Sequence, residues 1–321
     1  MNLIEEAAKR LQELEQAGIR APAAQPAREQ PKAEPPQTDP IPQRVMRAAL
    51  RAATPIQHPA ERRPEPTAQP QPQQTAPEAR NFRDIDLGRL QAAGFITPKV
   101  RESKLLHEFR ILKRPLIQNA LGKGAAPVAN GNLIMVTSAL PGEGKSFVSL
   151  NLAMSMALEM DCRVLLVDAD VLRPTIPKLL GIQRAKGLMD VLTEPELGFG
   201  DVLLRTNVER LTLALAGTPH RGSSELLASD AMTRLLQEIS SRYSDRIVVF
   251  DSPPLLATTE SRVLATRMGQ VVVVVEAERT THGVLESALS TVESCPVVLT
   301  LLNKARETDA GSYYGYYGHG A

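Results

Sequence analysis

The sequence of 321 residues predicts an α/β fold with a mostly parallel, doubly wound sheet that helices cover on both faces. Two observations lead to this prediction. After about residue 130, short runs that are apolar on both faces alternate with helical patterns, as in buried parallel sheets. A glycine-rich loop connects the first run to the first helical pattern. Ahead of this domain, the proline-rich sequence of residues 19–82 has no periodicity and predicts a largely disordered N-terminal region.

Residues 1–18 are predicted to form a short amphipathic helix. Apolar side chains from Leu3 to Leu14 recur every three or four residues among charged ones, and Gly18 ends the pattern. A short helix with one apolar stripe either docks on a partner protein or frays in water. Residues 19–82 are rich in Pro, Gln, Ala and Arg, and 14 of the 25 prolines lie between Pro22 and Pro77. This composition predicts a disordered linker.

Residues 83–130 are predicted to be a helical lead-in to the main domain. A short helical pattern runs from Ile85 to Gly94, and residues 104–114 form a basic amphipathic pattern that we expect Pro115 to stop. The main α/β domain is predicted over residues 131–308, followed by a Tyr/Gly-rich tail over residues 309–321.

Within residues 131–308, strands and helices are predicted to alternate. The predicted strands are 133–137, 163–168, 211–216, 246–250, 270–275 and 297–302. The predicted helices are 145–159, 229–243, 259–268 and 281–293. Such alternation is typical of βαβ units, in which ligands bind at the carboxyl ends of the strands.

The loop Ser138-Ala-Leu-Pro-Gly-Glu-Gly-Lys-Ser146 directly follows the apolar run 133–136. Backbone N–H groups around Gly142 and Gly144 can point at an anion, and the next helix adds the positive end of its dipole. Lys145 would reach the β- and γ-phosphates while the Ser146 hydroxyl binds Mg²⁺, as in the Walker A loop of a P-loop NTPase. The sequence therefore predicts an ATP and Mg²⁺ site, with Lys145 facing solvent in the empty protein.

The residues expected to contact nucleotide in this loop are Pro141, Gly142, Glu143, Gly144, Lys145, Ser146 and Phe147. Ala139 stands where the Walker A pattern has its first glycine. An ordinary glycine-rich turn with a surface lysine is therefore the alternative reading of the loop alone.

Acidic residues follow two of the predicted strands. Asp168 and Asp170 end the run 163–168, and Asp251 ends the run 246–250. Carboxylates at these positions are costly unless a positive charge lies opposite, and Mg²⁺ on a nucleotide supplies one. The alternative for Asp251 alone is a helix N-cap or a turn aspartate. The glycine loop and the three acids together favour a nucleotide site.

Composition excludes several functions. The net charge of +1 provides no basic field for nucleic acid. Cys162 and Cys295 precede predicted strands without metal-ligand spacing, so we expect two buried thiols in a reducing cytoplasm. No run approaches the ~18 apolar residues of a membrane-spanning helix, and charged residues at 5, 6 and 9 interrupt any signal-peptide core. We therefore expect no transmembrane segment.

With these motifs and the tail Tyr313-Tyr-Gly-Tyr-Tyr317, the chain resembles the bacterial tyrosine kinases of exopolysaccharide systems. Within that family it looks most like the exosortase-associated tyrosine autokinases. The resemblance covers roughly residues 85–318 and, through the short helix, the start of the chain. It implies transfer of the γ-phosphate of ATP to tyrosine hydroxyls, chiefly on neighbouring copies in a ring-like homo-oligomer. It also implies a cytoplasmic protein held at the inner membrane by a transmembrane polysaccharide co-polymerase that activates it, and a tyrosine phosphatase that reverses the reaction.

The resemblance also assigns roles to residues. Lys145 and Ser146 would hold phosphates and Mg²⁺, Asp251 would hold Mg²⁺ through water, and Asp170 would lie next to the metal. Asp168 would accept the tyrosine proton, which fits a reaction that needs mainly charge neutralisation and in-line positioning. Asn303 matches the adenine-contacting position, and a strand-end cap is its alternative. The phosphate acceptors would be Tyr313, Tyr314, Tyr316 and Tyr317.

Three positions, Leu172, His107 and Lys113, depart from the family pattern. Leu172 stands where an arginine is common, with Arg173 following. The self-association helix has His107, Arg110 and Lys113 in place of Glu-x-x-Arg-x-x-Arg. Two other functions remain as alternatives. A partition or positioning ATPase would carry a signature lysine at Leu140, and a non-catalytic adaptor would bind nucleotide and dock a membrane protein.

Overall fold

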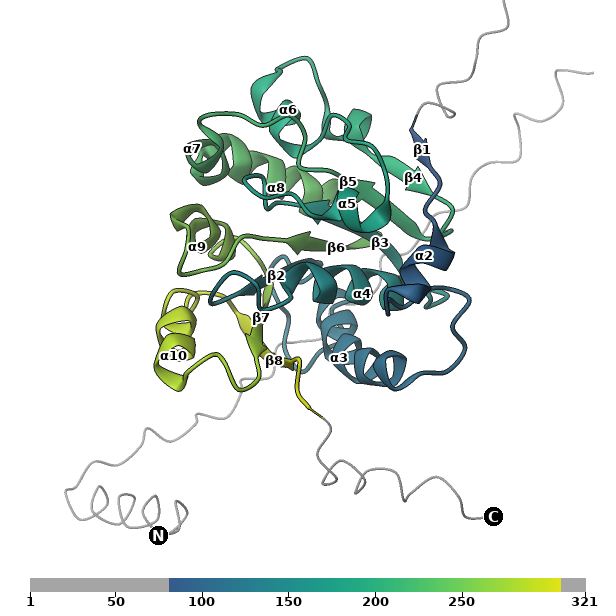
Figure 1. Cartoon of the computed structure of the whole chain (residues 1–321). Helices are drawn as coiled ribbons and strands as arrows, with labels where there is room; N and C mark the ends of the chain where they lie inside the picture. Colours follow the sequence, from purple (N-terminus) through teal and green to yellow (C-terminus); the bar gives the residue numbers. More distant parts are fainter. Residues whose placement is uncertain (1–80, 307–321) are drawn as a thin grey trace, which may run out of the picture. The chain divides into compact units, whose positions relative to one another are not determined.

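The computed structural model describes residues 81–306, so the predicted N-terminal helix, nearly all of the linker and the tyrosine tail lie outside the described residues. The described residues form one eight-stranded sheet in the order β1-β4-β5-β3-β6-β2-β7-β8 (Figure 1). Every neighbouring pair is parallel except β4 and β5. The predicted α/β fold with a mostly parallel sheet is therefore confirmed.

The six longer strands lie where the apolar runs predict them. They are β2 (Leu133–Ser138), β3 (Arg163–Asp168), β5 (Leu211–Ala214), β6 (Arg246–Asp251), β7 (Gln270–Glu276) and β8 (Val297–Asn303). Two short strands, β1 (Phe82–Arg83) and β4 (Leu204–Thr206), extend the sheet beyond β5. Two or three residues are too few to display a period of two, so periodicity does not predict them.

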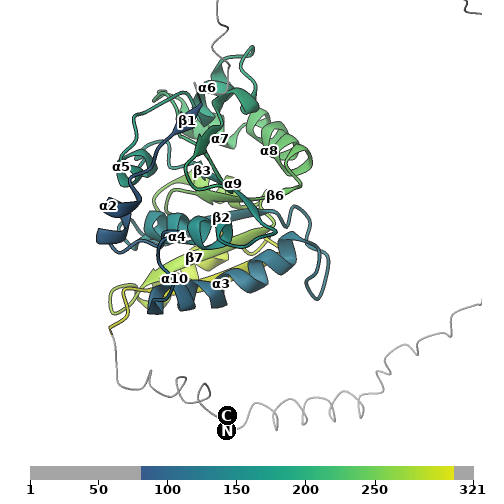
Figure 2. The ribbon, with the colours of Figure 1, turned by 90° about the vertical axis from the view of Figure 1, so that its right-hand side faces the viewer.

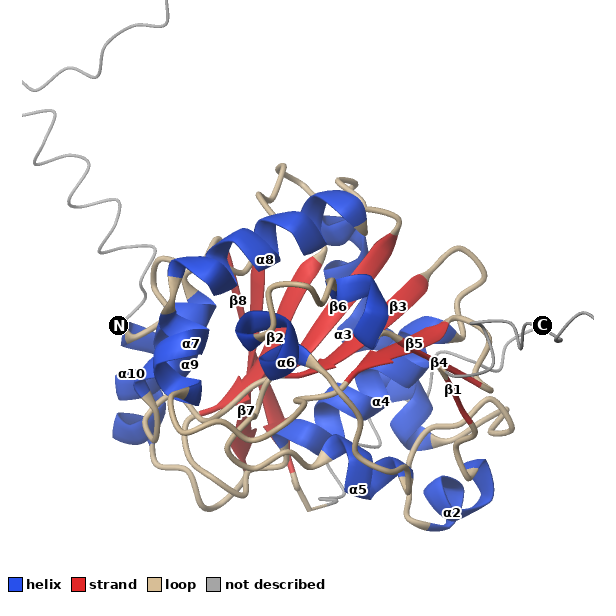
Figure 3. Cartoon of the chain, turned by 90° about the horizontal axis from the view of Figure 1, so that it is seen from above, coloured by secondary structure: helices blue, strands red, loops and turns tan. Residues whose placement is uncertain are grey.

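Helices cover both faces of the sheet (Figures 2 and 3). One face packs against α2 (Leu87–Ala92), α3 (Lys104–Ala120), α4 (Lys145–Ala157) and α5 (Ile176–Leu180). The other packs against α6 (Leu188–Thr193), the 3-10 helix η2 (Phe199–Val202), α7 (Ser223–Ala228), α8 (Asp230–Arg242), α9 (Thr259–Ala265) and α10 (His282–Ser290). Alternate residues of β2 enter the two cores, Ile134 and Val136 on one side and Leu133 and Met135 on the other. This explains why the strands are apolar on both faces.

The prediction that Pro115 ends its helix is wrong, because α3 continues through it to Ala120. Proline removes the hydrogen bond to the carbonyl of Ile111. Ile111 is 63% exposed and Pro115 is also exposed, so this face of the helix borders water, which can satisfy that carbonyl. Beyond the proline, Leu116 is fully buried, and Gln270 Nε2 donates to its carbonyl oxygen at 3.0 Å. Core packing therefore outweighs the lost hydrogen bond.

The three predicted self-association positions on α3 differ in their surroundings. His107 and Arg110 are exposed. Lys113 is buried instead, where its ammonium donates to the carbonyl oxygen of Ser155 at 2.6 Å and pairs with Glu159 at 2.7 Å. Segment 83–130 thus packs on the same core as the glycine loop. The Lys113 ammonium already has partners inside this chain, so it is not exposed for contact with another copy.

The two cysteines are free and buried, as expected. Burial raises the pKa of both thiols, with the nearby Glu159 charge adding to the effect at Cys162. Within residues 81–306, no helix combines the length and the apolar composition needed to cross a bilayer.

The edge of the sheet leads to a prediction about truncation. Ile85 is buried, its N–H donates to Asn207 Oδ1 at 3.0 Å, and Asn207 Nδ2 donates to its carbonyl oxygen at 2.9 Å. A chain that starts at Asn81 keeps these contacts, so we expect it to fold with a cooperative urea transition. A chain that starts at Asp86 loses a buried isoleucine, and its free energy of unfolding should fall by about 2–5 kcal/mol. Failure of the longer variant to fold would contradict the predicted linker.

Candidate active site

The glycine loop between β2 and α4 has the backbone geometry that the sequence predicts. Gly142 and Gly144 have φ values of 90° and 97°, which side chains with a Cβ atom rarely adopt. Gly144 is the N-cap residue of α4, and a Cβ atom there would lie 2.1 Å from Asn303 Nδ2. The loop thus requires glycine for its left-handed backbone conformation, and at Gly144 the missing Cβ atom also leaves room for the Asn303 side chain.

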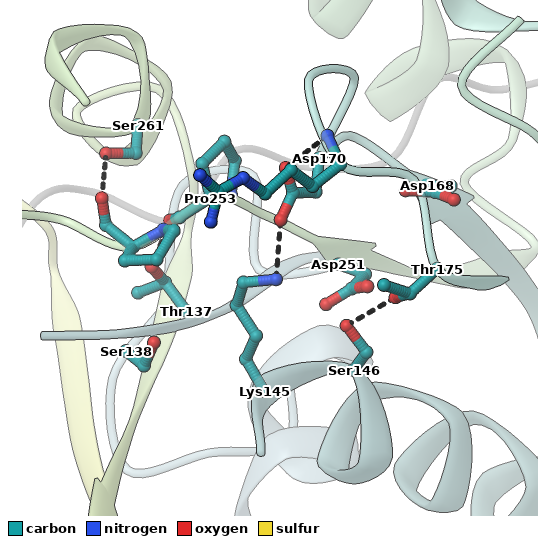
Figure 4. Close-up of polar contacts among 12 residues, drawn as sticks. Thr137, Ser138, Lys145, Ser146, Asp168, Asp170, Thr175, Asp251, Pro253 and Ser261 are labelled. Carbon is teal, nitrogen blue, oxygen red and sulfur yellow. Dashed lines mark hydrogen bonds and ion pairs between the residues drawn. The ribbon is translucent and has the colours of Figure 1, made fainter. Parts of the chain in front are cut away.

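Three carboxylates converge above this loop because β3 and β6 are neighbours. Asp168 and Asp251 are register partners at the carboxyl ends of these strands, and both are fully buried. Asp170 follows two residues after Asp168 and is 4% exposed. Figure 4 shows the Lys145 ammonium pointing at Asp170, with Nζ 2.6 Å from Oδ2.

The expectation that Lys145 faces solvent in the empty protein is wrong. Its side chain is only 11% exposed, because the three acids draw the ammonium into the site. Burial alone would lower the pKa of Lys145, but the charges of Asp251 and Asp170 outweigh burial and raise it. The lysine therefore stays charged and partly neutralises the acids.

Two of the acids are held in an environment that disfavours their charge. Burial, followed by the charges of Asp251 and Asp170, raises the pKa of Asp168 well above its ordinary value. Burial likewise raises the pKa of Asp251, against the favourable charge of Lys145. The site therefore holds more negative charge than its single lysine balances.

Unsatisfied oxygen atoms at the same place indicate what the site can bind. Asp168 Oδ1 and Asp251 Oδ2 are buried and have no hydrogen-bond partner. Buried polar atoms are rarely left unpaired unless a ligand or ion completes them. Among residues 81–306, no three His, Cys, Asp or Glu side chains are arranged to hold a metal by themselves. These residues suit Mg²⁺, because this ion takes one or two carboxylates and completes its shell with water and substrate phosphates.

Two hydroxyl residues that the sequence analysis missed contact this centre. Thr175 donates to Ser146 Oγ at 2.8 Å, and Ser149 donates to Asp251 Oδ1 at 3.1 Å. Ser149 lies one helical turn after Lys145, so the helix period could have indicated that it faces the site. Thr175 precedes the short helix α5, whose five residues give no usable period.

Three other residues predicted to contact nucleotide direct their side chains at neighbouring residues of the protein instead of at the cleft. The Glu143 side chain is turned inward and is 2% exposed. Phe147 packs its ring against Phe95, with ring centroids 5.0 Å apart. Asn303 Nδ2 donates to the carbonyl oxygen of Glu143 at 2.8 Å. The side chains of Glu143 and Asn303 thus hold the loop in the empty protein.

A cleft of about 370 Å³ opens beside Lys145 and Asp170. Its walls are largely apolar, and the residues lining it are Pro141, Gly142, Lys145, Asp170, Leu172, Arg173, Thr175, Pro253, Pro254, Ala257 and Thr258. Thr137 donates to the Pro253 carbonyl at 2.7 Å, and Ser261 donates to that of Pro254 at 3.2 Å (Figure 4). One wall is therefore fixed by hydrogen bonds next to the buried charges.

Comparisons with known proteins agree with this geometry. A family model described as NUBPL iron-transfer P-loop NTPase matches residues 130–284. EpsB of Ralstonia nicotianae is 35% identical over 195 residues, which are 59% of this chain and 25% of EpsB. The chain thus spans about a quarter of the length of this relative.

Shorter relatives are covered more fully. The solved kinase domain of VpsO is 29% identical with a TM-score of 0.51, over 64% of this chain and 100% of that domain. The tyrosine-protein kinase YwqD of Bacillus subtilis is 31% identical over 186 residues, which are 58% of this chain and 77% of YwqD. With this identity over more than three quarters of a tyrosine-protein kinase, and with the phosphate loop and acids in place, the chain belongs to the bacterial tyrosine kinase family of P-loop proteins.

Proposed function

We propose that this chain is an ATP-dependent protein-tyrosine autokinase that phosphorylates its own C-terminal tyrosines. The observation that carries the proposal is the juxtaposition of Lys145 and three buried acids with a largely apolar cleft. The charged part suits a metal-bound triphosphate, and the apolar part suits an aromatic ring. A serine acceptor would leave those walls without a partner.

Different residues around the phosphate loop would bind the phosphates and the Mg²⁺ of the nucleotide. Lys145 would leave Asp170 and contact the β- and γ-phosphates, and the loop N–H groups would donate to them. Ser146, Asp170 and Asp251 would hold Mg²⁺, directly or through water. When bound, Mg²⁺ neutralises charge that develops on the phosphate oxygens.

Asp168 would act as the proton acceptor. Its carboxylate would take the proton of the tyrosine hydroxyl as the phenolic oxygen forms a bond to the γ-phosphorus. The bond from that phosphorus to the bridging oxygen breaks, and ADP leaves with the electron pair. A raised pKa suits this role, because a base works best when its pKa lies near the working pH.

The proposed acceptors are Tyr313, Tyr314, Tyr316 and Tyr317, which lie outside the described residues. Tyr313 lies ten positions after Asn303, so the chain can extend at most about 36 Å between them. Within this length the tail would enter either the cleft of a neighbouring copy in a ring or its own cleft. Each phosphate adds about −1.5 to −2 charges, so a phosphorylated tail should be repelled by the acidic site and loosen the assembly.

The cellular setting is proposed from the family resemblance. We infer an exosortase-associated exopolysaccharide system, with this kinase cytoplasmic and held at the inner membrane by a transmembrane co-polymerase that activates it. A tyrosine phosphatase would reset the tail. The exposed His107 and Arg110 on α3 are available for self-association, whereas Lys113 is not.

A mixing experiment tests the proposed function. Lys145→Met protein with an intact tail is incubated with active protein whose four tail tyrosines are phenylalanine, in the presence of labelled ATP. We expect phosphotyrosine on the inactive partner, which demonstrates transfer between chains. The control is each protein alone. Free phosphate without phosphotyrosine from wild-type protein would instead support a positioning ATPase, and binding without turnover would support an adaptor.

A further inference from the structure

Three residues at or just after the ends of β7 and β8 contact the phosphate loop: Thr280, Asn303 and Lys304. Glu276, the last residue of β7, pairs with one of them, Lys304. Lys304 Nζ donates to the carbonyl oxygen of Gly142 at 2.8 Å and pairs with Glu276 at 3.1 Å. Asn303 donates to the next carbonyl, that of Glu143. Two successive loop carbonyls are thus held from outside the loop.

The inward-facing carboxylate of Glu143 completes this arrangement. Glu143 Oε2 accepts from the N–H of Leu140, at the start of the loop, at 2.7 Å. Its Oε1 accepts from the Thr280 hydroxyl. The same hydroxyl oxygen accepts from the N–H of Glu276 at 3.3 Å. Since the Glu143 carboxylate is almost fully buried, both of its hydrogen bonds are needed to compensate for burial.

We propose that the Thr280–Glu143 hydrogen bond is a brace that holds the phosphate loop in its binding shape before nucleotide arrives. Glu143 and Thr280 are positioning residues: their side chains shape the loop whose backbone N–H groups meet phosphate, and these side chains do not touch phosphate themselves. The inference rests on the proposed function in that it takes the loop to bind nucleotide.

The brace has a specific energetic consequence. Without the Thr280 hydroxyl, one buried carboxylate oxygen lacks a donor, and Glu143 gains by turning outward to water. The loop then occupies its binding shape for a smaller fraction of the time. Apparent affinity falls by that fraction, so a tenfold lower population raises the Kd for ATP about tenfold.

The test compares Thr280→Val, which keeps the shape of the side chain, with Thr280→Ser, which keeps the hydroxyl. Thr281→Val is the matched control, because Thr281 is exposed and its side chain makes no capping hydrogen bond at α10. Two measurements are made: ATP titration with Mg²⁺, and amide hydrogen exchange of loop peptides in the empty protein. The second needs neither nucleotide nor turnover.

For Thr280→Val we expect a Kd and a KM for ATP about tenfold higher, with kcat within about threefold of wild type. Loop amides should exchange about tenfold faster in the empty protein, since exchange reports local opening. Thr280→Ser and Thr281→Val should match wild type in both measurements. Wild-type values for either measurement in Thr280→Val, or a loss confined to kcat, would overturn the brace. Failure of wild-type protein to bind ATP would instead refute the proposed function.

Discussion

Lys145→Met is expected to lower phosphotyrosine formation by about 100-fold or more, because it removes the ammonium that pairs with Asp170 and that we propose contacts the γ-phosphate. Methionine has a similar length and no charge, so the loop backbone and the cleft keep their shape. Labelled ATP with phosphotyrosine analysis measures the loss. Appreciable autophosphorylation by the purified variant would contradict the assigned role.

The same substitution should also lower the stability of the empty protein. Lys145 is the cation within the acidic centre, and its loss leaves Asp168, Asp170 and Asp251 buried together without compensation. Lys145→Arg is the matched control, since arginine keeps the charge but presents a planar fork instead of a compact ammonium. We expect the arginine variant to melt close to wild type and yet remain largely inactive. That result would show that stability depends on the positive charge at position 145, whereas phosphate transfer depends on the compact shape and position of the ammonium.

Much of the fold could be predicted because its signals are local. The six longer strands are apolar runs bounded by turns or charged residues, and the loop glycines mark one strand-to-helix junction. Other elements depend on distant contacts. The strand β4 pairs through Arg205 with Phe82 of β1, far away in the sequence, and α3 passes through Pro115 because Leu116 is anchored by Gln270. No window of sequence contains both partners of these contacts.

In the candidate site, too, some features follow from local sequence and others depend on distant contacts. Asp168, Asp170 and Asp251 end two apolar runs, so sequence alone places them at one edge of the sheet. The orientation of Lys145 could not be predicted, because it depends on the charge that neighbouring strands bring together. Glu143 is predicted to contact nucleotide, and the inward turn of its carboxylate depends on Thr280, 137 positions later in the chain. Long-range pairing therefore decides which loop residues bind ligand and which hold the loop.

Asp168→Asn should lower activity but raise stability, whereas Lys145→Met should lower both. Loss of the proton acceptor should lower transfer by about 100-fold or more, while affinity for Mg-ATP stays within about tenfold, or ~1.4 kcal/mol, because phosphate contacts remain. The asparagine oxygen can still accept from the Ile176 N–H, which lies 3.3 Å from Asp168 Oδ2. Unlike Lys145→Met, this variant removes a disfavoured charge from the centre. We therefore expect it to be inactive and more stable than wild type.

The pH dependence of that added stability follows from the sign of the shift. Burial and the two neighbouring acids raise the pKa of Asp168 well above its ordinary value of 3.8, so ionisation is costlier in the folded chain than in the unfolded one. Below the unfolded-state pKa, Asp168 is protonated in the folded and the unfolded chain, so it does not destabilise the fold. This destabilisation grows as the pH rises from the unfolded-state pKa toward the folded-state pKa. The difference in melting temperature between Asp168→Asn and wild type should therefore increase as the pH is raised from 4 to 8. Asp161→Asn, the same change at an exposed acid, should show no such increase. A wild-type protein that is more stable than Asp168→Asn at pH 8 would contradict the charge balance described for this site.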